Sequence, residues 1–261
     1  MEKSMEENKI EIENEIINNT GNKNQSQIAG AIIIAGLVIA GAILLKGNNA
    51  PVPTNNEVPI TSLAPVGKGD RILGNPKAKV ALVLYGDFQC PFCGAVYGLE
   101  EDTEAIKYLK NIDPNWTPFM IGVKEYAEAG DVQFVYRDWA FLGTESTQSA
   151  EAARCAGDQE KFWEYHDYLY AHQNGENKGA FSDPNLKAFA KTLGLEASAF
   201  DKCLDEGKYA QAVADSKAEG TKAGVTGTPK GFILKNGKIV DTIGGAESGT
   251  TVRQKIENAL K

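Results

Sequence analysis

Metal-binding side chains are scarce in this chain of 261 residues. It contains four cysteines and two histidines, too few for a protein built around several zinc ions, since each tetrahedral site takes four ligands. An excess of positive charge is also lacking, because 35 acidic residues outnumber 27 basic ones and leave a net charge of -8. Domains that bind nucleic acid are more often basic, so we expect no nucleic-acid partner.

Charged residues are absent from one stretch, residues 28–45 (IAGAIIIAGLVIAGAILL). A helix of that length is about 27 Å long, close to the hydrocarbon thickness of a bilayer. A cleaved signal peptide is the alternative, and it usually has a short basic start and a cleavage site of small residues. Here 27 residues with six Glu precede the stretch and Lys46 follows it. We therefore predict an uncleaved transmembrane anchor.

The predicted anchor divides the chain into four parts. Residues 1–27 form an acidic tail. Residues 46–70 are rich in Pro, Asn and Gly, which is typical of an extended linker. Residues 71–261, about 190 residues, are enough for one domain with a well-filled core.

Within this domain, the order of apolar patterns predicts an α/β fold. Apolar runs typical of buried strands, and a hairpin joined by Asn236-Gly237, account for the predicted strands. These are residues 78–85, 132–136, 231–235 and 238–243. Helical spacing extends over residues 145–223 and again over about 250–260. The prediction is an α/β sandwich with a helical insertion at about 140–224.

Two cysteines, Cys90 and Cys93, directly follow the first predicted strand and enclose Pro91 and Phe92. Such a pair can be half of a zinc site, but the two remaining cysteines do not form a second C-x-x-C. Pro91 suits the first turn of a helix. Cys90 would then lie at the positive end of the helix dipole, which lowers the pKa of a thiol. We expect Cys90 to be the attacking sulfur and Cys93 the resolving one, with no metal.

A strand, the CPFC motif, a helix and a late Thr228-Pro229 before a hairpin resemble the thioredoxin fold. The long helical block between them resembles the DsbA-like thiol:disulfide oxidoreductases of bacteria, which are membrane-anchored or secreted. The resemblance covers residues 71–261. Its further motifs are 136–138 (YRD), 152–156 (AARCA), 161–166 (KFWEYH) and 224–229 (GVTGTP).

This resemblance implies a function and a place. Thr228-Pro229 would be a cis peptide bond facing the CPFC motif, and its backbone would pair with an extended substrate peptide. The domain would lie outside the cytoplasm on a single-pass anchor in the cell membrane, with the acidic tail, residues 1–27, on the cytoplasmic side. Without a cofactor, it would introduce disulfide bonds into reduced or unfolded secreted polypeptides, and a membrane partner would reoxidise it. A reductase or isomerase on the same fold, and a non-catalytic peptide-binding chaperone, remain alternatives.

The chain departs from its relatives at several positions. Many relatives carry a buried acid six residues before the first cysteine, where this chain has Leu84; Asp87 either replaces that acid or merely ends the strand. Phe92 stands where strongly oxidising relatives have His, which can donate to a thiolate, so we expect a less extreme oxidant. Residues 111–130 are longer than the corresponding connection, and Trp116 and Phe119 there belong either to the core or to a substrate surface.

Cys155 and Cys203 both lie in the helical block. With Cys90 and Cys93 paired, they form the other possible disulfide, and some relatives carry a second bridge in this block. An oxidising compartment favours a structural disulfide; two buried free thiols are the alternative. The two histidines, His166 and His172, lie among aromatic residues, and we expect them to be packed or surface side chains.

Overall fold

The computed structural model describes residues 63–67 and 69–261 of the chain. The predicted tail, the predicted anchor at 28–45 and most of the predicted linker lie outside these residues. Within the described part, no helix is both long enough and apolar enough to cross a membrane.

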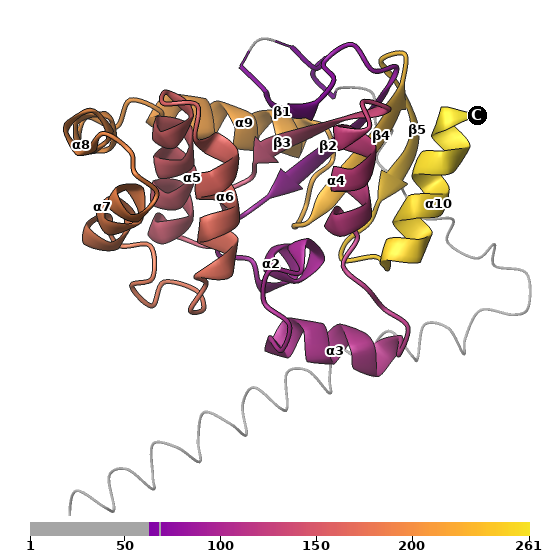
Figure 1. Ribbon diagram of the computed structural model, residues 1–261, viewed down its shortest axis with the longest axis horizontal. Helices are drawn as coiled ribbons and strands as arrows, with labels where there is room; N and C mark the ends of the chain where they lie inside the picture. The colour runs from indigo at the N-terminus through magenta and orange to yellow at the C-terminus, as the bar shows by residue number, and fades with distance from the viewer. Residues whose placement is uncertain (1–62, 68) are drawn as a thin grey trace, which may run out of the picture. The chain divides into compact units, whose positions relative to one another are not determined.

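A mixed sheet of five strands, in the order β1-β3-β2-β4-β5, forms the centre of the domain (Figure 1). β2 and β3 are parallel, and the other neighbours are antiparallel. The strands are β1 (Arg71–Gly74), β2 (Val80–Gly86), β3 (Val132–Asp138), β4 (Lys230–Lys235) and β5 (Lys238–Ile243). Every residue of β2 is buried, which explains its unbroken apolar sequence.

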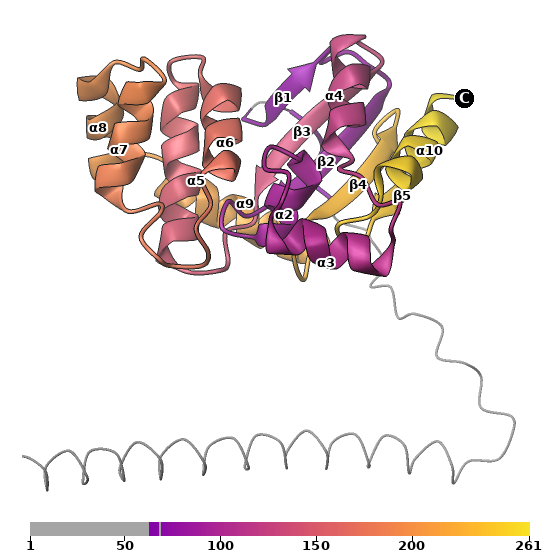
Figure 2. The ribbon, with the colours of Figure 1, turned by 60° about the horizontal axis from the view of Figure 1, so that its bottom comes forward.

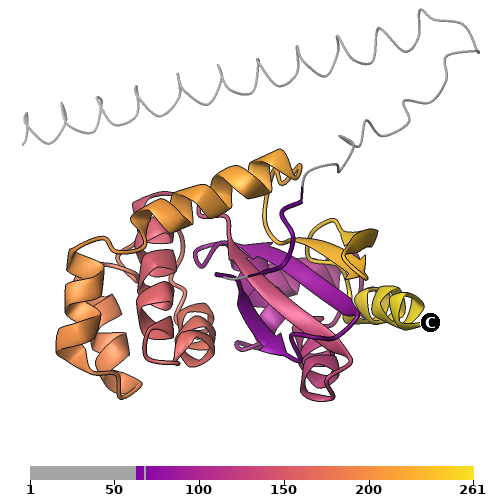
Figure 3. The ribbon, with the colours of Figure 1, turned by 90° about the horizontal axis from the view of Figure 1, so that it is seen from above.

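The described residues also form nine helices. They are α2 (Pro91–Tyr97), α3 (Glu104–Ile112), α4 (Met120–Glu128), α5 (Thr144–Gly157), α6 (Phe162–Ala171), α7 (Asp183–Thr192), α8 (Ala197–Asp205), α9 (Ala210–Lys222) and α10 (Gly249–Leu260). α4 and α10 cover one face of the sheet and α9 crosses the other (Figure 3). The helices α5 to α8 form the helical block beside the sheet (Figure 1).

Two apolar cores lie on the two faces of the sheet. Successive side chains of a strand point to opposite faces, so β2 contributes Leu82 and Leu84 to the larger core and Val83 and Tyr85 to the smaller one. The larger core extends into the helical block. Leu84 is 1% exposed, so an apolar side chain fills the position at which many relatives carry an acid.

The predicted order of strands, helical block, hairpin and final helix is confirmed. Asn236 and Gly237 have φ values of 51° and 75°, as a two-residue hairpin turn requires. The insertion runs from α5 to α9, within the predicted 140–224. Two elements, β1 and α4, were not predicted. Trp116 and Phe119, just before α4, are 3% and 2% exposed and so belong to the core.

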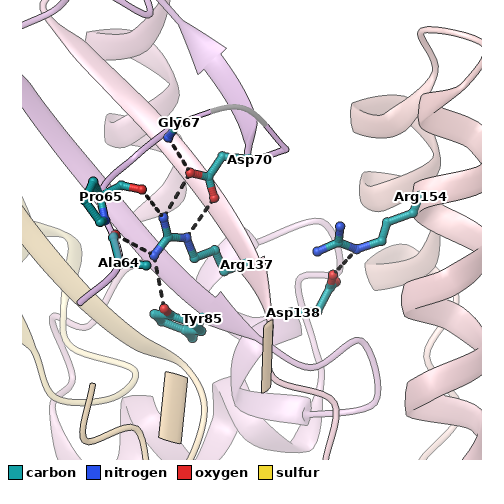
Figure 4. Close-up of polar contacts among 8 residues, drawn as sticks. All are labelled: Ala64, Pro65, Gly67, Asp70, Tyr85, Arg137, Asp138 and Arg154. Atoms are coloured by element: carbon teal, nitrogen blue, oxygen red, sulfur yellow. Dashed lines mark hydrogen bonds and ion pairs between the residues drawn. The ribbon is translucent and has the colours of Figure 1, made fainter. Parts of the chain in front are cut away.

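The last residues of the predicted linker pack against the domain, so the folded part begins before residue 71. We call residues 63–67 and 69–70 the N-terminal strap. Arg137 of β3 holds it: its guanidinium donates to both carboxylate oxygens of Asp70 at 2.8 and 2.9 Å and to the carbonyls of Ala64 and Pro65 at 3.0 and 3.2 Å (Figure 4). The same side chain donates to the Tyr85 hydroxyl. Leucine and valine side chains of the strap pack on the smaller core.

Candidate active site

The two cysteines of the CPFC motif lie where β2 leads into α2. Cys90 is the N-cap residue of α2, and Cys93 lies in its first turn behind Pro91. Pro91 has the fixed φ that a helix start needs and no N–H to leave unpaired. Both cysteines are free thiols, and they are 4% and 1% exposed. Of the pair, Cys90 is therefore the sulfur nearer to solvent.

Thr228 and Pro229, although 138 residues further along the chain, lie against Cys90. Their peptide bond is cis, and the Cys90 thiol donates to the Thr228 carbonyl oxygen over 3.3 Å. The Thr228 hydroxyl is buried and has no hydrogen-bond partner in the described part of the chain. The loop thus offers Cys90 a carbonyl acceptor and a hydroxyl donor.

The pKa of Cys90 is lowered to about 7. The largest cause is a hydrogen bond from the Cys93 thiol; burial acts in the opposite direction, and the Thr228 side chain and the backbone N–H groups of Cys93 and Phe92 lower the pKa further. Hydrogen bonds to a thiolate favour the charged form. Since α2 has only seven residues, these local donors explain the shift better than a helix dipole.

Cys93 has the opposite character. Burial raises its pKa well above the usual value for a thiol, and the hydrogen bond to Cys90 and the charge on Cys90 raise it further. Cys90 is therefore the sulfur nearer to the surface, with a lowered pKa. Cys93 is the buried sulfur, and its raised pKa keeps it protonated. Thiolates, rather than thiols, attack disulfides, so of the two sulfurs Cys90 is the one suited to attack.

Asp87 is buried, 1% exposed, and its carboxylate is fully engaged. One oxygen accepts from the Gln89 N–H at 2.8 Å and the Ser146 hydroxyl at 2.7 Å. The other accepts from the backbone N–H groups of Phe141 and Leu142 at 2.8 and 3.1 Å. Asp87 thus ties the loop before Cys90 to the loop before α5, which is a positioning role rather than that of a free acid.

Two glutamines that the sequence analysis did not single out also hold this loop. The Gln173 amide, just after α6, donates to the Phe88 carbonyl at 2.6 Å and to the Cys90 carbonyl at 3.0 Å. The Gln89 side chain accepts from the Asn177 N–H. The helical block therefore contacts the redox site directly. No sequence pattern marks a glutamine for such a contact.

Phe92 is half-buried, and its ring lies edge-on to that of Tyr108 in α3, with centroids 5.9 Å apart. α3 lies beside α2 (Figure 2). An aromatic ring offers no hydrogen to the Cys90 sulfur of the kind a histidine would.

The other two cysteines, Cys155 and Cys203, are joined by a disulfide. It links α5 to α8 inside the helical block, so it belongs to the scaffold and not to the redox pair. In the residues that the structure describes, no group of three or more His, Cys, Asp and Glu side chains could hold a metal ion.

The sequence matches known proteins over most of this domain. A family model described as Thioredoxin matches residues 67–108 and 121–253. Over 207 residues, the chain is 25% identical to the probable disulfide bond formation protein D of Bacillus anthracis, covering 78% of this chain and 84% of that protein. It is 32% identical over 168 residues to the Na(+)/H(+) antiporter NhaA 1 of Salinispora arenicola, covering 63% of this chain. The match spans only 21% of that antiporter.

Solved structures share the fold. Oxidised BdbD from Bacillus subtilis superimposes with a TM-score of 0.59 at 22% identity, over 76% of this chain and 97% of that one. Wolbachia pipientis alpha-DsbA1 gives a TM-score of 0.59 at 18% identity, over 76% and 94%. The predicted thioredoxin fold with a helical insertion is thereby confirmed. The chain therefore belongs to the thioredoxin family.

Proposed function

We propose that this protein introduces disulfide bonds into reduced polypeptides outside the cytoplasm. The observation that carries the proposal is the asymmetry of its cysteine pair. Cys90 has a pKa of about 7, whereas burial holds Cys93 protonated. A stabilised Cys90 thiolate favours the reduced pair and so makes the oxidised pair a better disulfide donor.

The reaction uses the oxidised pair. A substrate thiolate attacks the Cys90 sulfur, the Cys90–Cys93 bond breaks, and Cys93 leaves and takes up a proton. A second substrate thiolate then attacks the substrate sulfur of this mixed disulfide. The substrate leaves with a new disulfide, Cys90 leaves as a thiolate, and two electrons remain on the cysteine pair.

The Thr228-Pro229 loop would hold the substrate during this exchange. In the thiol state, Cys90 donates to the Thr228 carbonyl. A Cys90 sulfur bonded to substrate has no hydrogen to donate, so this carbonyl is released to accept a backbone N–H from the substrate. An extended peptide beside the loop would thereby be placed next to Cys90, as the family resemblance implies.

The place of action and the partner are part of the same proposal. Residues 28–45 would anchor the chain in the cell membrane with the catalytic domain outside. The Cys155–Cys203 disulfide supports an oxidising compartment, since such bonds are rare in the cytosol. A membrane redox partner would reoxidise the Cys90–Cys93 pair after each turnover.

A disulfide reductase or isomerase is the second candidate, and one observation favours it. A Cys90 pKa of about 7 is close to that of thioredoxin and above the ~3.5 of strongly oxidising DsbA. Phe92 cannot donate a hydrogen bond to the Cys90 thiolate as a histidine would, which also favours a weaker oxidant. The two candidates differ in the reduction potential of the pair.

The deciding experiment is equilibration of the full-length protein with mixtures of reduced and oxidised glutathione. We expect a potential between the ~-120 mV of DsbA and the ~-180 mV of protein disulfide isomerase, because the thiolate is stabilised without a histidine. A value near the ~-270 mV of thioredoxin would instead support the reductase.

A second measurement separates the enzyme from a peptide-binding chaperone. We expect Cys90→Ser to abolish oxidation of a reduced model protein, since the attacked sulfur is gone. Suppression of aggregation of the same protein is the parallel readout. Unchanged activity of Cys90→Ser in both assays would contradict the oxidase proposal and support the chaperone.

A further inference from the structure

A buried thiol that leaves and attacks in each turnover needs a route for its proton. Cys93 is 1% exposed, and burial raises its pKa well above the ordinary value. It must gain a proton when it leaves and lose one when the pair is reoxidised. Bulk water does not reach it directly.

β2, the strand that leads to the cysteine pair, carries no acidic side chain. Leu84 of this strand lies in the core. The nearest carboxylate in sequence, Asp87, already accepts four hydrogen bonds from two backbone loops and the Ser146 hydroxyl. Protonation of Asp87 would disrupt the contacts that position Cys90. The proton of Cys93 therefore needs another acceptor.

A hydrogen-bonded chain of side chains begins one helical turn from Cys93. Tyr97 follows Cys93 by four residues on α2, so the two side chains share one helix face. The Tyr97 hydroxyl lies 3.0 Å from Nε2 of His166. Nδ1 of His166 lies 2.9 Å from one oxygen of Asp167, and Lys124 donates to the other oxygen at 2.7 Å.

This chain runs from the core to the surface. Tyr97 and His166 are 3% and 0% exposed, whereas the side chains of Asp167 and Lys124 are 34% and 29% exposed. Burial raises the pKa of Tyr97, and negative charge on Asp167 and on Cys93 raises it further. Charge on Cys93 raises the pKa of Tyr136 and Tyr170 as well. The helix face that Tyr97 shares with Cys93, and the contact of its hydroxyl with His166, are what single out Tyr97.

The partners of His166 set the direction of its hydrogen bonds. Burial lowers the pKa of His166, so the ring is neutral and carries one hydrogen. A carboxylate only accepts, so that hydrogen is on Nδ1, facing Asp167. Nε2 then accepts from the Tyr97 hydroxyl, whose oxygen keeps lone pairs free for a donor. This is the arrangement of a base oriented by a carboxylate.

We propose that Tyr97, His166 and Asp167 form the proton relay of Cys93. During reoxidation the Cys93 thiol gives its proton to the Tyr97 oxygen as Tyr97 gives its own to Nε2 of His166. The imidazolium then passes its Nδ1 proton to the Asp167 carboxylate. Asp167 is partly exposed and releases the proton to water at the surface. When Cys93 leaves during substrate oxidation, the same proton moves in reverse, so no further reactant is required. This inference rests on the proposed redox function of the pair.

Other groups also face the relay. The titratable and charged groups facing His166 or Cys93 are Cys90, Tyr97, Lys124, Tyr136, Asp138, Asp167 and Tyr170. Among them, the Tyr136 and Tyr170 hydroxyls pair with each other over 3.0 Å. Tyr170 stacks on Tyr97, with ring centroids 4.5 Å apart, and so provides a matched control within the same cluster.

The test follows the two steps by which the reduced full-length protein reacts with oxidised glutathione. In the first step the Cys90 thiolate attacks and one glutathione leaves. In the second, Cys93 loses its proton, attacks the Cys90 sulfur and releases the other glutathione. Acid quenching and mass spectrometry distinguish the mixed disulfide from the closed pair at each time.

We expect Tyr97→Phe to slow the second step at least about tenfold, a modest part of what a positioned proton acceptor contributes. The first step and its pH profile should not change, so the mixed disulfide accumulates. His166→Gln, which keeps a polar side chain but cannot take up and release a proton, should show the same selective delay. Tyr170→Phe should leave both steps at wild-type rates.

Three outcomes would overturn the relay. Wild-type rates of the second step in both Tyr97→Phe and His166→Gln would show that the proton takes another path. Equal slowing of both steps would make the role structural, and the same delay in Tyr170→Phe would assign the effect to the cluster as a whole. A wild-type protein that performs neither step would instead refute the proposed function itself.

Discussion

At the scale of single residues, the buried Thr228 hydroxyl is the least satisfied polar group beside the redox pair. In the described part of the chain it has no partner while Cys90 is a thiol, and an unpaired buried hydroxyl costs about 1–3 kcal/mol. It lowers the pKa of Cys90 because it can donate to the thiolate. The site thus holds an unsatisfied donor that becomes satisfied when Cys90 ionises.

We therefore expect Thr228→Val to raise the pKa of Cys90 from about 7 by about one unit, since a hydrogen bond to a charged group contributes about 1.5–3 kcal/mol. At pH 7 less thiolate is present, so attack by Cys90 on oxidised glutathione slows roughly fivefold. The thiolate absorbance titrated against pH measures the shift. Thr226→Val, at an exposed residue of the same loop, is the control, and an unmoved titration in Thr228→Val would contradict the expectation.

The CPFC cysteines and the loop that lies against them could be predicted as neighbours, whereas most of the contacts that hold them could not. Cys90 and Thr228 lie in short motifs next to predicted strands. Asp87 could be singled out by its position before Cys90, but its contacts could not. Asp87, Gln89 and Gln173 each bind the backbone of a loop more than 50 residues away. Polar side chains in loops have no periodicity, so only the fold shows which backbone groups they meet.

At the scale of elements, long periodic segments were predicted and short ones were not. β2 is buried along its whole length, and the first five residues of β3 are apolar except for Gln133, so both strands had a clear apolar pattern. β1 has four residues of which three are half-buried and one exposed, and its existence depends on pairing with β3. α4 follows Pro118 within a long connection and has only nine residues.

The bridge between α5 and α8 gives a prediction at this scale. Cys155 and Cys203 are separated by 48 residues, and closing such a loop stabilises a protein by about 4 kcal/mol in the chain-entropy model. We expect the double variant Cys155→Ser/Cys203→Ser to lose up to this amount in urea unfolding under oxidising conditions. Cys90→Ser/Cys93→Ser controls for the loss of two sulfurs. Equal stability of wild type and the bridge variant would contradict the expectation.

At the scale of the whole molecule, the centre of the larger core is unusually polar. His166 is fully buried among aromatic rings that include Phe88, Tyr136 and Trp163. The ring is held neutral there, since burial lowers its pKa. The folded state therefore takes up a proton less readily at this site than the unfolded chain does.

This difference predicts that the free energy of unfolding falls as the pH is lowered. An unfolded histidine titrates at about pH 6.5, and the folded pKa lies lower. Below about pH 6.5 the unfolded chain binds the proton first, so the free energy of unfolding falls by up to about 1.4 kcal/mol per pH unit. Unfolding in urea at several pH values between about 7 and 5 should show this slope. His166→Gln should flatten it and His172→Gln should not; an equal slope in wild type and His166→Gln would refute the assignment.

The strap held by Arg137 has a mechanical consequence. Asp70 and the Ala64 and Pro65 carbonyls all meet one guanidinium, and that side chain belongs to β3, inside the sheet. A pulling force on the chain from its N-terminal side would act on the strap. The hydrogen bonds of this guanidinium would pass that force to β3 before it reached β1. The helix that carries Cys90 and Cys93 lies on the other face of the sheet from the strap's apolar contacts. Tension from the direction of the N-terminus would thus be absorbed away from the two reacting sulfurs.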